Sequence, residues 1–432
     1  MNNARPANGS MWLVLCAALC AASMWLYLYR VLIPHQVADA AAHGRPRGNL
    51  SDLYPRWIGA RELLLHGRNP YSPEVTREIQ SGYYGRPLDP SRPNDPKDQQ
   101  GFAYPVYVVF GLAPTIGLPF EIVQMGFFWL LLLLTCAGIP VWLRILRWPT
   151  PLWTQFGLIL LTLGSLAVMQ GLKLRQLTLF VAVLVLAAMV LFVSDHLIAA
   201  GVLLALATIK PQLVGLLLLW LALWTSADWR RRYRWLASFL VTMAVLFGAS
   251  EFWLPHWLSR FWQAVQDYRS YTGAASVLDV LIAPPLSRIV EFLSLAATAV
   301  VCWRERNQPA NSEAFARVLC LVLAITVLVV PTYAPYNQVL LIPAVLLLAK
   351  ERREFWRRSR IGSALFVIAT FLVAWPWIWS IPIAALSFVL PPAVAQRFFT
   401  VPFWTAFLIP VGVAALMLVR SYRGSFSASR GA

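Results

Sequence analysis

The 432-residue chain is 59% hydrophobic, has a mean hydropathy of +0.62 and contains only 13% charged residues. A soluble protein carries about 25% charged residues, so this composition excludes an ordinary soluble protein and indicates a polytopic membrane protein. The formal net charge of +17 invites comparison with nucleic-acid-binding proteins. However, many of the Lys and Arg residues form short clusters between apolar runs, as in cytoplasmic loops, so we expect no nucleic-acid partner. These clusters lie at residues 230–234, 304–306, 350–360 and 420–423.

The chain begins with a polar segment and one long apolar run. Residues 1–11 are expected in the cytoplasm. Residues 12–34 form the first span, which is longer than the apolar region of a removable signal peptide. The loop at residues 35–101 then lies on the other side of the membrane, and it holds eight of the 19 acidic residues. We predict that this external loop carries the catalytic site.

Two stretches have the pattern of amphipathic helices that lie in the plane of the membrane surface. The first lies within residues 49–71 and is stopped by Gly67 and Pro70. The second is residues 255–281, within an external loop at 255–288. Two surface loops of this kind predict a roof over a cavity between the spans.

The remaining apolar runs predict a helix bundle over residues 102–254 and C-terminal spans over residues 289–419. Residues 102–119 contain three prolines and predict either a kinked short span or a re-entrant segment. The two runs around Lys210 are too short to cross a hydrocarbon core of about 30 Å, which predicts half-helices or steeply packed neighbours. We therefore predict one all-α integral membrane domain with about 12 spans (about 11 to 13) and a cytoplasmic tail at residues 420–432.

The cysteines and histidines show no metal-ligand spacing. All five Cys lie in or at the ends of apolar runs, and the five His are scattered along the chain. We expect no metal and no cofactor, with one alternative left open: loop acids that share a divalent cation with a phosphate.

Several motifs together resemble one family. Asp52, the aromatic Tyr54, a helical run and Gly67-Arg68-Asn69-Pro70-Tyr71 resemble the first-loop signature of the DUF2029 family, also called glycosyltransferase family 87. Later matches, which extend the resemblance to about residues 52–348, are Phe102-Ala103-Tyr104-Pro105, Lys210-Pro211 after a run containing Ala and Gly, and Tyr333-Ala334-Pro335-Tyr336-Asn337-Gln338. The resemblance implies a GT-C fold and transfer of a sugar from a polyprenyl-phosphate carrier to an acceptor outside the cytoplasm.

One motif departs from the family pattern. The family usually has Gly-Gln-x-Asn where this chain has Arg175 before Gln176 and Thr178 in place of the Asn. Gln176 and Arg175 are candidates for donor binding, and the alternative for both is a plain polar loop between two spans.

Asp52 is the predicted catalytic base, because the family carries an acid at this position and partial burial raises the pKa of a carboxylate toward neutrality. The alternative is that Asp52 only caps the helix that starts near Pro55.

Lys210 is the predicted ligand of the carrier phosphate. An ionisable side chain in an apolar stretch costs about 3 kcal/mol to insert, which favours a functional role. The alternative is a lysine that extends from a tight turn to the lipid headgroups. Arg56 is expected to assist in substrate binding.

Tyr104, Tyr336 and Asn337 are predicted to line the sugar pocket, because sugars stack on aromatic rings and form hydrogen bonds with amides. For each of them, an anchor at the membrane interface is the alternative.

The predicted reaction is a single displacement with inversion at the anomeric carbon. The predicted acceptor is a lipid or glycan, the donor sugar is a hexose such as mannose, and the site faces outward from a bacterial plasma membrane. A transporter or flippase of lipid or polysaccharide precursors is the alternative, since a broken helix with a lysine in the membrane also suits transport. A single cavity open outward favours transfer, and a pathway between two similar halves favours transport.

Overall fold

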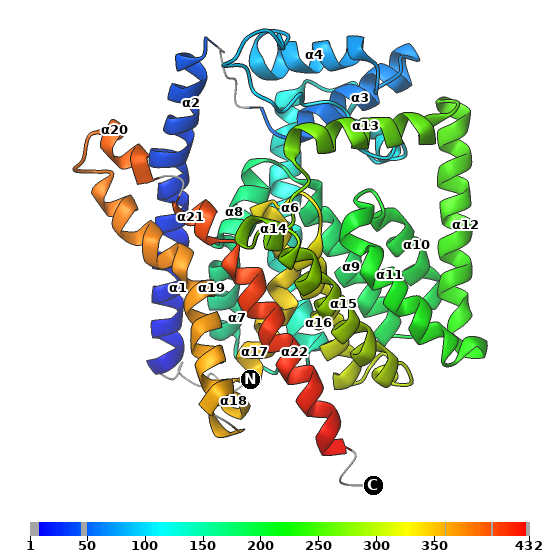
Figure 1. Ribbon diagram of the computed structural model, residues 1–432, viewed down its shortest axis with the longest axis vertical. Coiled ribbons are helices and arrows are strands. Elements are labelled where there is room, and N and C mark those ends of the chain that lie inside the picture. Colours follow the sequence, from blue (N-terminus) through cyan, green and yellow to red (C-terminus); the bar gives the residue numbers. More distant parts are fainter. Residues whose placement is uncertain (1–7, 45–49, 359, 399–400, 429–432) are drawn as a thin grey trace.

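All regular structure in the described chain is helical. The computed structural model describes residues 8–44, 50–358, 360–398 and 401–428, and these residues form helices and no strands (Figure 1). The prediction of an all-α protein is confirmed. Most of the predicted cytoplasmic start at residues 1–11 lies outside the described residues, as does the end of the predicted tail.

Six helical segments of the described chain are long and apolar enough to cross a membrane. They are Met11–Ala42, Phe120–Ile145, Trp229–Trp253, Leu286–Glu305, Arg360–Leu386 and Pro392–Tyr422. A bent pair, α7 (Leu152–Leu163) and α8 (Leu166–Lys173), meets at 61° and adds a seventh candidate if it counts as one span. These helices fit a multi-pass membrane protein.

The predicted number of about 12 spans is not confirmed. The sequence prediction counts several shorter apolar helices as spans. The longest of these, α9 (Leu177–Val193), has 17 residues. At about 1.5 Å per residue such a helix is about 26 Å long, which is less than the hydrocarbon thickness of about 30 Å.

The first long helix leads to a helical cap at one end of the bundle. α1 (Asn8–Tyr27) continues through a π-helical turn (Leu28–Leu32) into α2 (Ile33–Ala42). Above the bundle lie α3 (Leu53–His66) and α4 (Pro73–Tyr84) (Figure 1). α3 is the helix predicted within residues 49–71, and it ends at Gly67, whose φ of +65° favours glycine.

The proline-rich segment at residues 102–119 does not cross the bundle. Its only helices are α5 (Val108–Leu112) and a short 3₁₀ turn (Ala113–Thr115). Trp57 Nε1 of α3 donates a hydrogen bond of 3.1 Å to the carbonyl of Thr115, which keeps this segment at the same end as α3. The segment is therefore not a kinked span across the bundle, and it stays at the α3 end.

The basic clusters gather at the opposite end. α6 (Phe120–Ile145) runs from the Trp57 ring, 5.3 Å from Phe120, to the turn at Arg147, which donates a hydrogen bond to the Asn311 carbonyl. In the same region Arg232 donates to the Arg306 carbonyl at 2.8 Å. α3 and α4 therefore lie at one end of the molecule (Figure 1), and the turns that contain Arg147 and Arg306 lie at the other.

The middle of the chain is broken beside Lys210, as predicted. α10 (Leu197–Ala207) and α11 (Pro211–Ser226) flank the break, and α12 (Trp229–Trp253) returns to the α3 end. α10 packs tightly on α12: a Cβ on Gly201 would lie 2.1 Å from the carbonyl oxygen of Trp235.

The second predicted surface stretch forms two helices. α13 (Trp257–Thr272) lies across the end of the bundle near α3 and α4 (Figure 1), and α14 (Val277–Leu281) follows it. Gly273, with φ of +74°, separates them, because a left-handed residue ends the first helix. α13 forms part of a roof over the bundle end.

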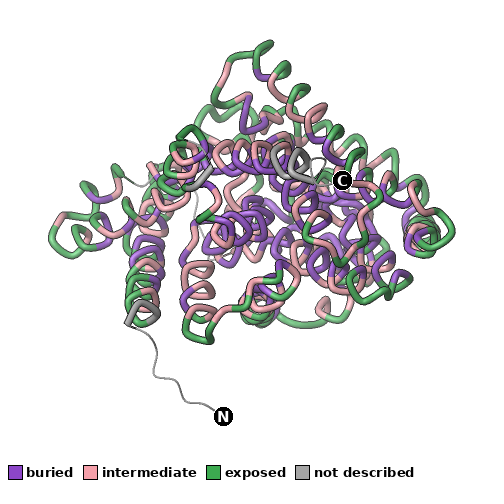
Figure 2. Tube along the Cα trace, turned by 90° about the horizontal axis from the view of Figure 1, so that it is seen from below, coloured by how far each residue is buried: buried purple, intermediate pink, exposed green. Residues whose placement is uncertain are grey.

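The C-terminal part packs around one central helix. Residues 318–328 of α16 (Glu313–Val329) are all buried, as expected for a helix that is apolar on every side. Figure 2 shows buried positions gathered in the middle of the bundle and exposed ones along its edge. The other elements are α15 (Leu286–Glu305), the 3₁₀ helix η3 (Pro335–Leu341), α17 (Ile342–Lys350), α18 (Arg352–Arg358), α19 (Arg360–Leu386), α20 (Pro392–Ala395), η4 (Gln396–Phe398), α21 (Val401–Thr405) and α22 (Leu408–Ala428).

A buried ion pair attaches α22 to the end of α17. Arg420 Nε lies 2.5 Å from Glu351 Oε2, and their side chains are only 10% and 8% exposed. We expect Arg420→Ala to lower the free energy of unfolding by about 3 to 5 kcal/mol, because it leaves a buried carboxylate unpaired. Thermal unfolding in detergent measures this effect. Arg352→Ala, at an exposed position nearby, is the control, and an equal loss in both variants would contradict the role of the pair.

Candidate functional site

Asp52 lies at the start of α3 but does not cap it. Its side chain makes no hydrogen bond to the first turn of α3. Instead, its Oδ2 accepts a hydrogen bond from Gln176 Nε2, in the residue before α9. Within the described chain, Oδ1 has no hydrogen-bond partner. The alternative that Asp52 serves only as a helix cap is wrong, and one oxygen remains available to a ligand.

Lys210 lies in the break before α11 and turns inward. Its side chain donates hydrogen bonds to Gln176 Oε1 at 2.8 Å and Thr178 Oγ1 at 2.7 Å, and the residue is only 6% exposed. The ammonium nitrogen also lies 5.1 Å from the ring centre of Tyr336 and 5.6 Å from that of Tyr104, within cation–π range. A lysine that reaches the headgroups does not fit this position.

Gln176 connects the acid and the lysine. The amide nitrogen of Gln176 donates to Asp52, and its amide oxygen accepts from Lys210. These two partners fix the orientation of the side-chain amide. Thr178, which takes the place of the family's Asn, accepts from Lys210 and donates to Asn337 Oδ1 at 3.3 Å. A continuous polar chain therefore links Asp52, Gln176, Lys210, Thr178 and Asn337.

Arg56 is held one helical turn after Asp52. Its Nη1 donates to the Asp52 carbonyl at 2.6 Å, and its guanidinium carbon lies 4.4 Å from the centre of the Tyr104 ring. Burial by itself lowers the pKa of Arg56, but Tyr104 and the Asp52 carboxylate outweigh it, so the pKa is raised and the charge is retained. Its Nε is buried without a hydrogen-bond partner in the described chain, so a donor is left for a ligand.

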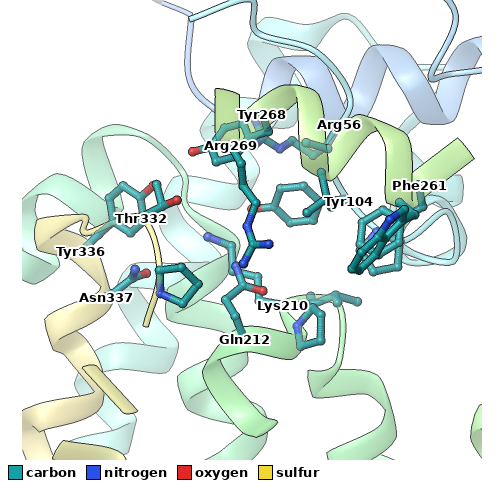
Figure 3. A pocket seen from close by; sticks show the side chains of 17 residues that line it. Arg56, Tyr104, Lys210, Gln212, Phe261, Tyr268, Arg269, Thr332, Tyr336 and Asn337 are labelled. Atoms are coloured by element: carbon teal, nitrogen blue, oxygen red, sulfur yellow. The ribbon is translucent and has the colours of Figure 1, made fainter. Parts of the chain in front are cut away.

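Several of these side chains line a cavity of about 270 Å³ beneath α13 (Figure 3). α3 contributes Arg56, the segment before α5 contributes Tyr104, and the break before α11 contributes Lys210. The other lining residues are Ala103, Pro105, Ile209, Pro211, Gln212, Phe261, Trp262, Val265, Tyr268, Arg269, Pro331, Thr332, Tyr336 and Asn337. Asp52 and Gln176 are not among the lining residues, but Lys210 donates a hydrogen bond to Gln176, and Gln176 donates one to Asp52, which is partly exposed.

The charge of the cavity is unbalanced. Its lining includes Arg56, Lys210 and Arg269, and none of the described lining residues is an acid. In Figure 3 the Arg269 side chain hangs from α13 toward Lys210 and Gln212. A concave site with this excess of positive charge favours an anion such as a phosphate.

Aromatic rings form much of the remaining wall. Tyr104, Tyr336, Phe261 and Tyr268 all line the cavity. Burial, together with the charge of Asp98, raises the pKa of Tyr268 to about 12, so its hydroxyl stays a neutral hydrogen-bond donor at physiological pH. Flat rings beside neutral donors and acceptors suit a sugar.

Arg175 is not brought to the cavity. It adopts a left-handed conformation (φ +49°), and its guanidinium donates to the carbonyls of Gln124 and Lys173. The same group stacks on the Phe128 ring with a separation of 5.3 Å. Of the predicted site residues, Arg56, Lys210, Tyr104, Tyr336 and Asn337 line the cavity, and hydrogen bonds connect Gln176 and Asp52 to Lys210.

The sequence analysis missed four polar residues of the lining: Tyr268, Arg269, Gln212 and Thr332. A signal for Arg269 exists in the sequence, because Trp262, Val265 and Arg269 follow the three- and four-residue spacing of one helix face. A cation on the apolar face of an amphipathic helix is unusual, and it points here into the cavity.

The described residues contain no cluster of metal-binding side chains. Within them, no three or more His, Cys, Asp or Glu side chains lie close enough together to hold a metal ion.

Comparison with known proteins gives a family match. The family model for glycosyltransferase family 87 matches residues 102–331, slightly more than half of the chain. The match contains Tyr104, Gln176, Lys210 and Arg269, and Asp52 precedes it. No curated protein and no solved structure gives a significant match.

Proposed function

The chain belongs to glycosyltransferase family 87 and is therefore a membrane glycosyltransferase, and on this premise we propose its donor, its mechanism and its orientation. The donor is a polyprenyl-phosphate sugar, such as a mannose, and the acceptor is a lipid or glycan. The fold is of the GT-C type, and the reaction takes place on the non-cytoplasmic side. The observation that carries this proposal is the convergence of three cations on a cavity whose described lining has no acid.

The proposed reaction is a single displacement. Asp52 takes the proton of an acceptor hydroxyl through Oδ1, which has no hydrogen-bond partner among the described residues, while Gln176 donates to Oδ2. The hydroxyl oxygen attacks the anomeric carbon as the bond from that carbon to the phosphate oxygen breaks. The polyprenyl phosphate leaves with the electron pair of that bond, and the anomeric configuration is inverted.

The leaving phosphate is stabilised by Lys210, Arg56 and Arg269. Charged donors form hydrogen bonds to phosphate that are about twice as strong as neutral ones, and a buried site strengthens them further. The buried Arg56 Nε that lacks a partner is available for this purpose. Tyr104 and Tyr336, which line the cavity, stack on the donor sugar.

The outward orientation is supported by the distribution of charge. The cavity lies at the α3 and α13 end, and the Arg-rich turns lie at the other (Figure 1). Short loops rich in Arg and Lys tend to stay in the cytoplasm, which favours the far side of the membrane for the cavity.

An assay with radiolabelled polyprenyl-phosphate sugars tests this function. Membranes with and without the protein receive a panel of donors that includes mannose, glucose, galactose and arabinose, and covalently labelled products are counted. We expect label in a lipid or glycan product from at least one donor, only when the protein is present. Movement of the intact donor across the membrane without any covalent product would favour a transporter instead.

Arg269→Ala is expected to lower kcat/KM for the donor by a factor of about 10 to 100, because it removes one charged hydrogen bond to the phosphate. Steady-state kinetics of purified protein in lipid discs give this ratio. Arg260→Ala is the matched control, because Arg260 lies on the same helix and is absent from the cavity lining. Equal losses in the two variants would contradict the role given to Arg269.

A further inference from the structure

A separate cavity of about 420 Å³ lies at the Arg-rich end of the molecule, where α6 ends and α7 begins. It shares no lining residue with the cavity beneath α13. Its lining residues are Pro140, Leu143, Arg144, Arg147, Trp148, Pro149, Thr150 and Gln155.

Contacts within the protein fix the turn that forms this cavity. Arg147 adopts a left-handed conformation (φ +52°), which reverses the chain after α6. The backbone N–H of Trp148 then donates a hydrogen bond of 2.9 Å to the Leu143 carbonyl. From the other side, Lys350 Nζ donates to the Leu146 carbonyl at 2.9 Å. The wall of the cavity is therefore held in shape by the helices around it.

The charge of this cavity is positive and unbalanced. Its lining includes Arg144 and Arg147, and none of the described lining residues is an acid. Arg144 forms no hydrogen bond or ion pair with the described residues, and Arg147 uses only Nη2, which donates to the Asn311 carbonyl. Glu313, an acid in the same region, lies 2.8 Å from Lys350 and is paired with it. Two guanidinium groups with free donors favour an anion such as a phosphate.

Apolar side chains beside the cavity face outward. Leu152 and Phe156 are neighbours of the lining residue Gln155 on α7, three residues before it and one after it. Their exposed fractions are 80% and 47%, and that of Trp153 is 51%. In a membrane protein such exposed side chains contact acyl chains, and Trp favours the level of the headgroups. A ligand of this cavity therefore meets both a cationic wall and a surface that suits lipid.

We propose that this cavity binds the phosphate group of an anionic phospholipid. The lipid belongs to the leaflet at the Arg-rich end, which is the cytoplasmic leaflet in the orientation proposed above. Arg144 and Arg147 donate hydrogen bonds to the phosphate oxygens, and the acyl chains lie along Leu152 and Phe156. A choline headgroup is disfavoured, because it would bring a third positive charge to a cavity whose described lining has no acid.

The lipid and the sugar donor occupy different cavities. Bilayer phospholipid is present in large excess over a polyprenyl-phosphate donor, so it fills the cavity at the Arg-rich end by mass action. The donor binds beneath α13, where Lys210, Arg56 and Arg269 line the other cavity.

Native mass spectrometry of the purified full chain, freed of lipid in detergent, tests this inference. The three probes are dioleoyl phosphatidylglycerol, dioleoyl phosphatidylcholine with the same acyl chains, and glycerol 3-phosphate, which has a phosphate but no acyl chains. The test variants are Arg144→Glu, which reverses the charge, and Arg144→Lys, which keeps it. Arg230→Glu is the matched control, because Arg230 is also exposed, lies at the start of α12 and is absent from the cavity lining.

We expect the wild-type protein to bind the first phosphatidylglycerol at least about tenfold more tightly than phosphatidylcholine, with no binding of glycerol 3-phosphate at the same concentration. Arg144→Glu should weaken the first phosphatidylglycerol by a factor of about 10 or more, since a charged hydrogen bond is replaced by a repulsion. Arg144→Lys should weaken it less than about threefold, and Arg230→Glu should leave it unchanged. Equal melting temperatures of the four lipid-free proteins show that the variants are folded.

Four results would overturn the lipid site. Unchanged phosphatidylglycerol binding in Arg144→Glu, or an equal loss in Arg230→Glu, would remove this cavity from lipid binding. Equal affinities for the two lipids would exclude selection of an anionic headgroup. Binding of glycerol 3-phosphate as tight as that of phosphatidylglycerol would assign the cavity to a soluble phosphate. None of these measurements involves sugar transfer, so the lipid site and the proposed function can be rejected independently.

Discussion

Asp52→Asn is expected to lower kcat for sugar transfer by a factor of about 100 to 10,000, the range for loss of a general base. Asparagine has nearly the same shape, and its oxygen can still accept the hydrogen bond from Gln176. It cannot take the proton of the acceptor hydroxyl. The donor should therefore still bind, with an unchanged dissociation constant, while turnover is lost.

Turnover of labelled donor and equilibrium binding of polyprenyl phosphate, measured on the same purified protein, separate these effects. Asp39→Asn, the same substitution at an exposed site on α2, is the control. Normal turnover in Asp52→Asn would remove Asp52 from the mechanism. Loss of donor binding together with turnover would assign Asp52 to substrate binding instead.

Lys210→Met is expected to weaken use of the donor by a factor of about 10 to 150 in kcat/KM. This corresponds to about 1.5 to 3 kcal/mol for one hydrogen bond to a charged group. The melting temperature should change little. Methionine removes the cost of burying an ammonium group, but it leaves Gln176 and Thr178 without a donor, and these effects oppose each other.

Kinetics at several donor concentrations and thermal unfolding measure the two outcomes. Lys97→Met, in the exposed part of the first loop, provides the control for loss of a positive charge. Unchanged donor kinetics in Lys210→Met would show that the phosphate binds elsewhere. A large fall in melting temperature would make Lys210 a structural residue.

Residues far apart in the sequence come together as the motif pattern predicts. The first loop, the break before α11 and η3 supply Asp52, Lys210 and Asn337, and one chain of hydrogen bonds joins them. These residues could be identified from the sequence because polar and charged residues are rare in and beside apolar stretches. This signal does not depend on how the helices pack.

Other features depend on geometry that the sequence does not determine. Arg175 belongs to the same motif as Gln176, but its left-handed backbone turns the guanidinium toward Gln124 and away from the cavity. Arg269 enters the cavity only because α13 lies across the bundle end, and the placement of a surface helix follows from tertiary packing. The sequence analysis predicted a cavity under a roof of surface loops, without most of the α13 residues that line it.

The number of spans is the other point where the sequence is insufficient. Apolar runs of 11 and 16 residues, such as α10 and α11, have the composition of membrane helices without the length to cross. An apolar helix has apolar surroundings, but hydropathy does not distinguish lipid from the interior of a helix bundle. The segment at residues 102–119 is a similar case, because only the hydrogen bond from Trp57 to Thr115 fixes its end of the molecule.

The most direct test of the central claim is a cryo-electron microscopy structure of the protein with an unreactive phosphonate analogue of a polyprenyl-phosphate mannose. We expect the phosphonate between Lys210, Arg56 and Arg269, with the sugar against Tyr104 and its anomeric carbon toward Asp52. A phosphonate bound at the opposite end, near Arg144 and Arg147, or a cavity beneath α13 that stays free of ligand at saturation, would contradict this account.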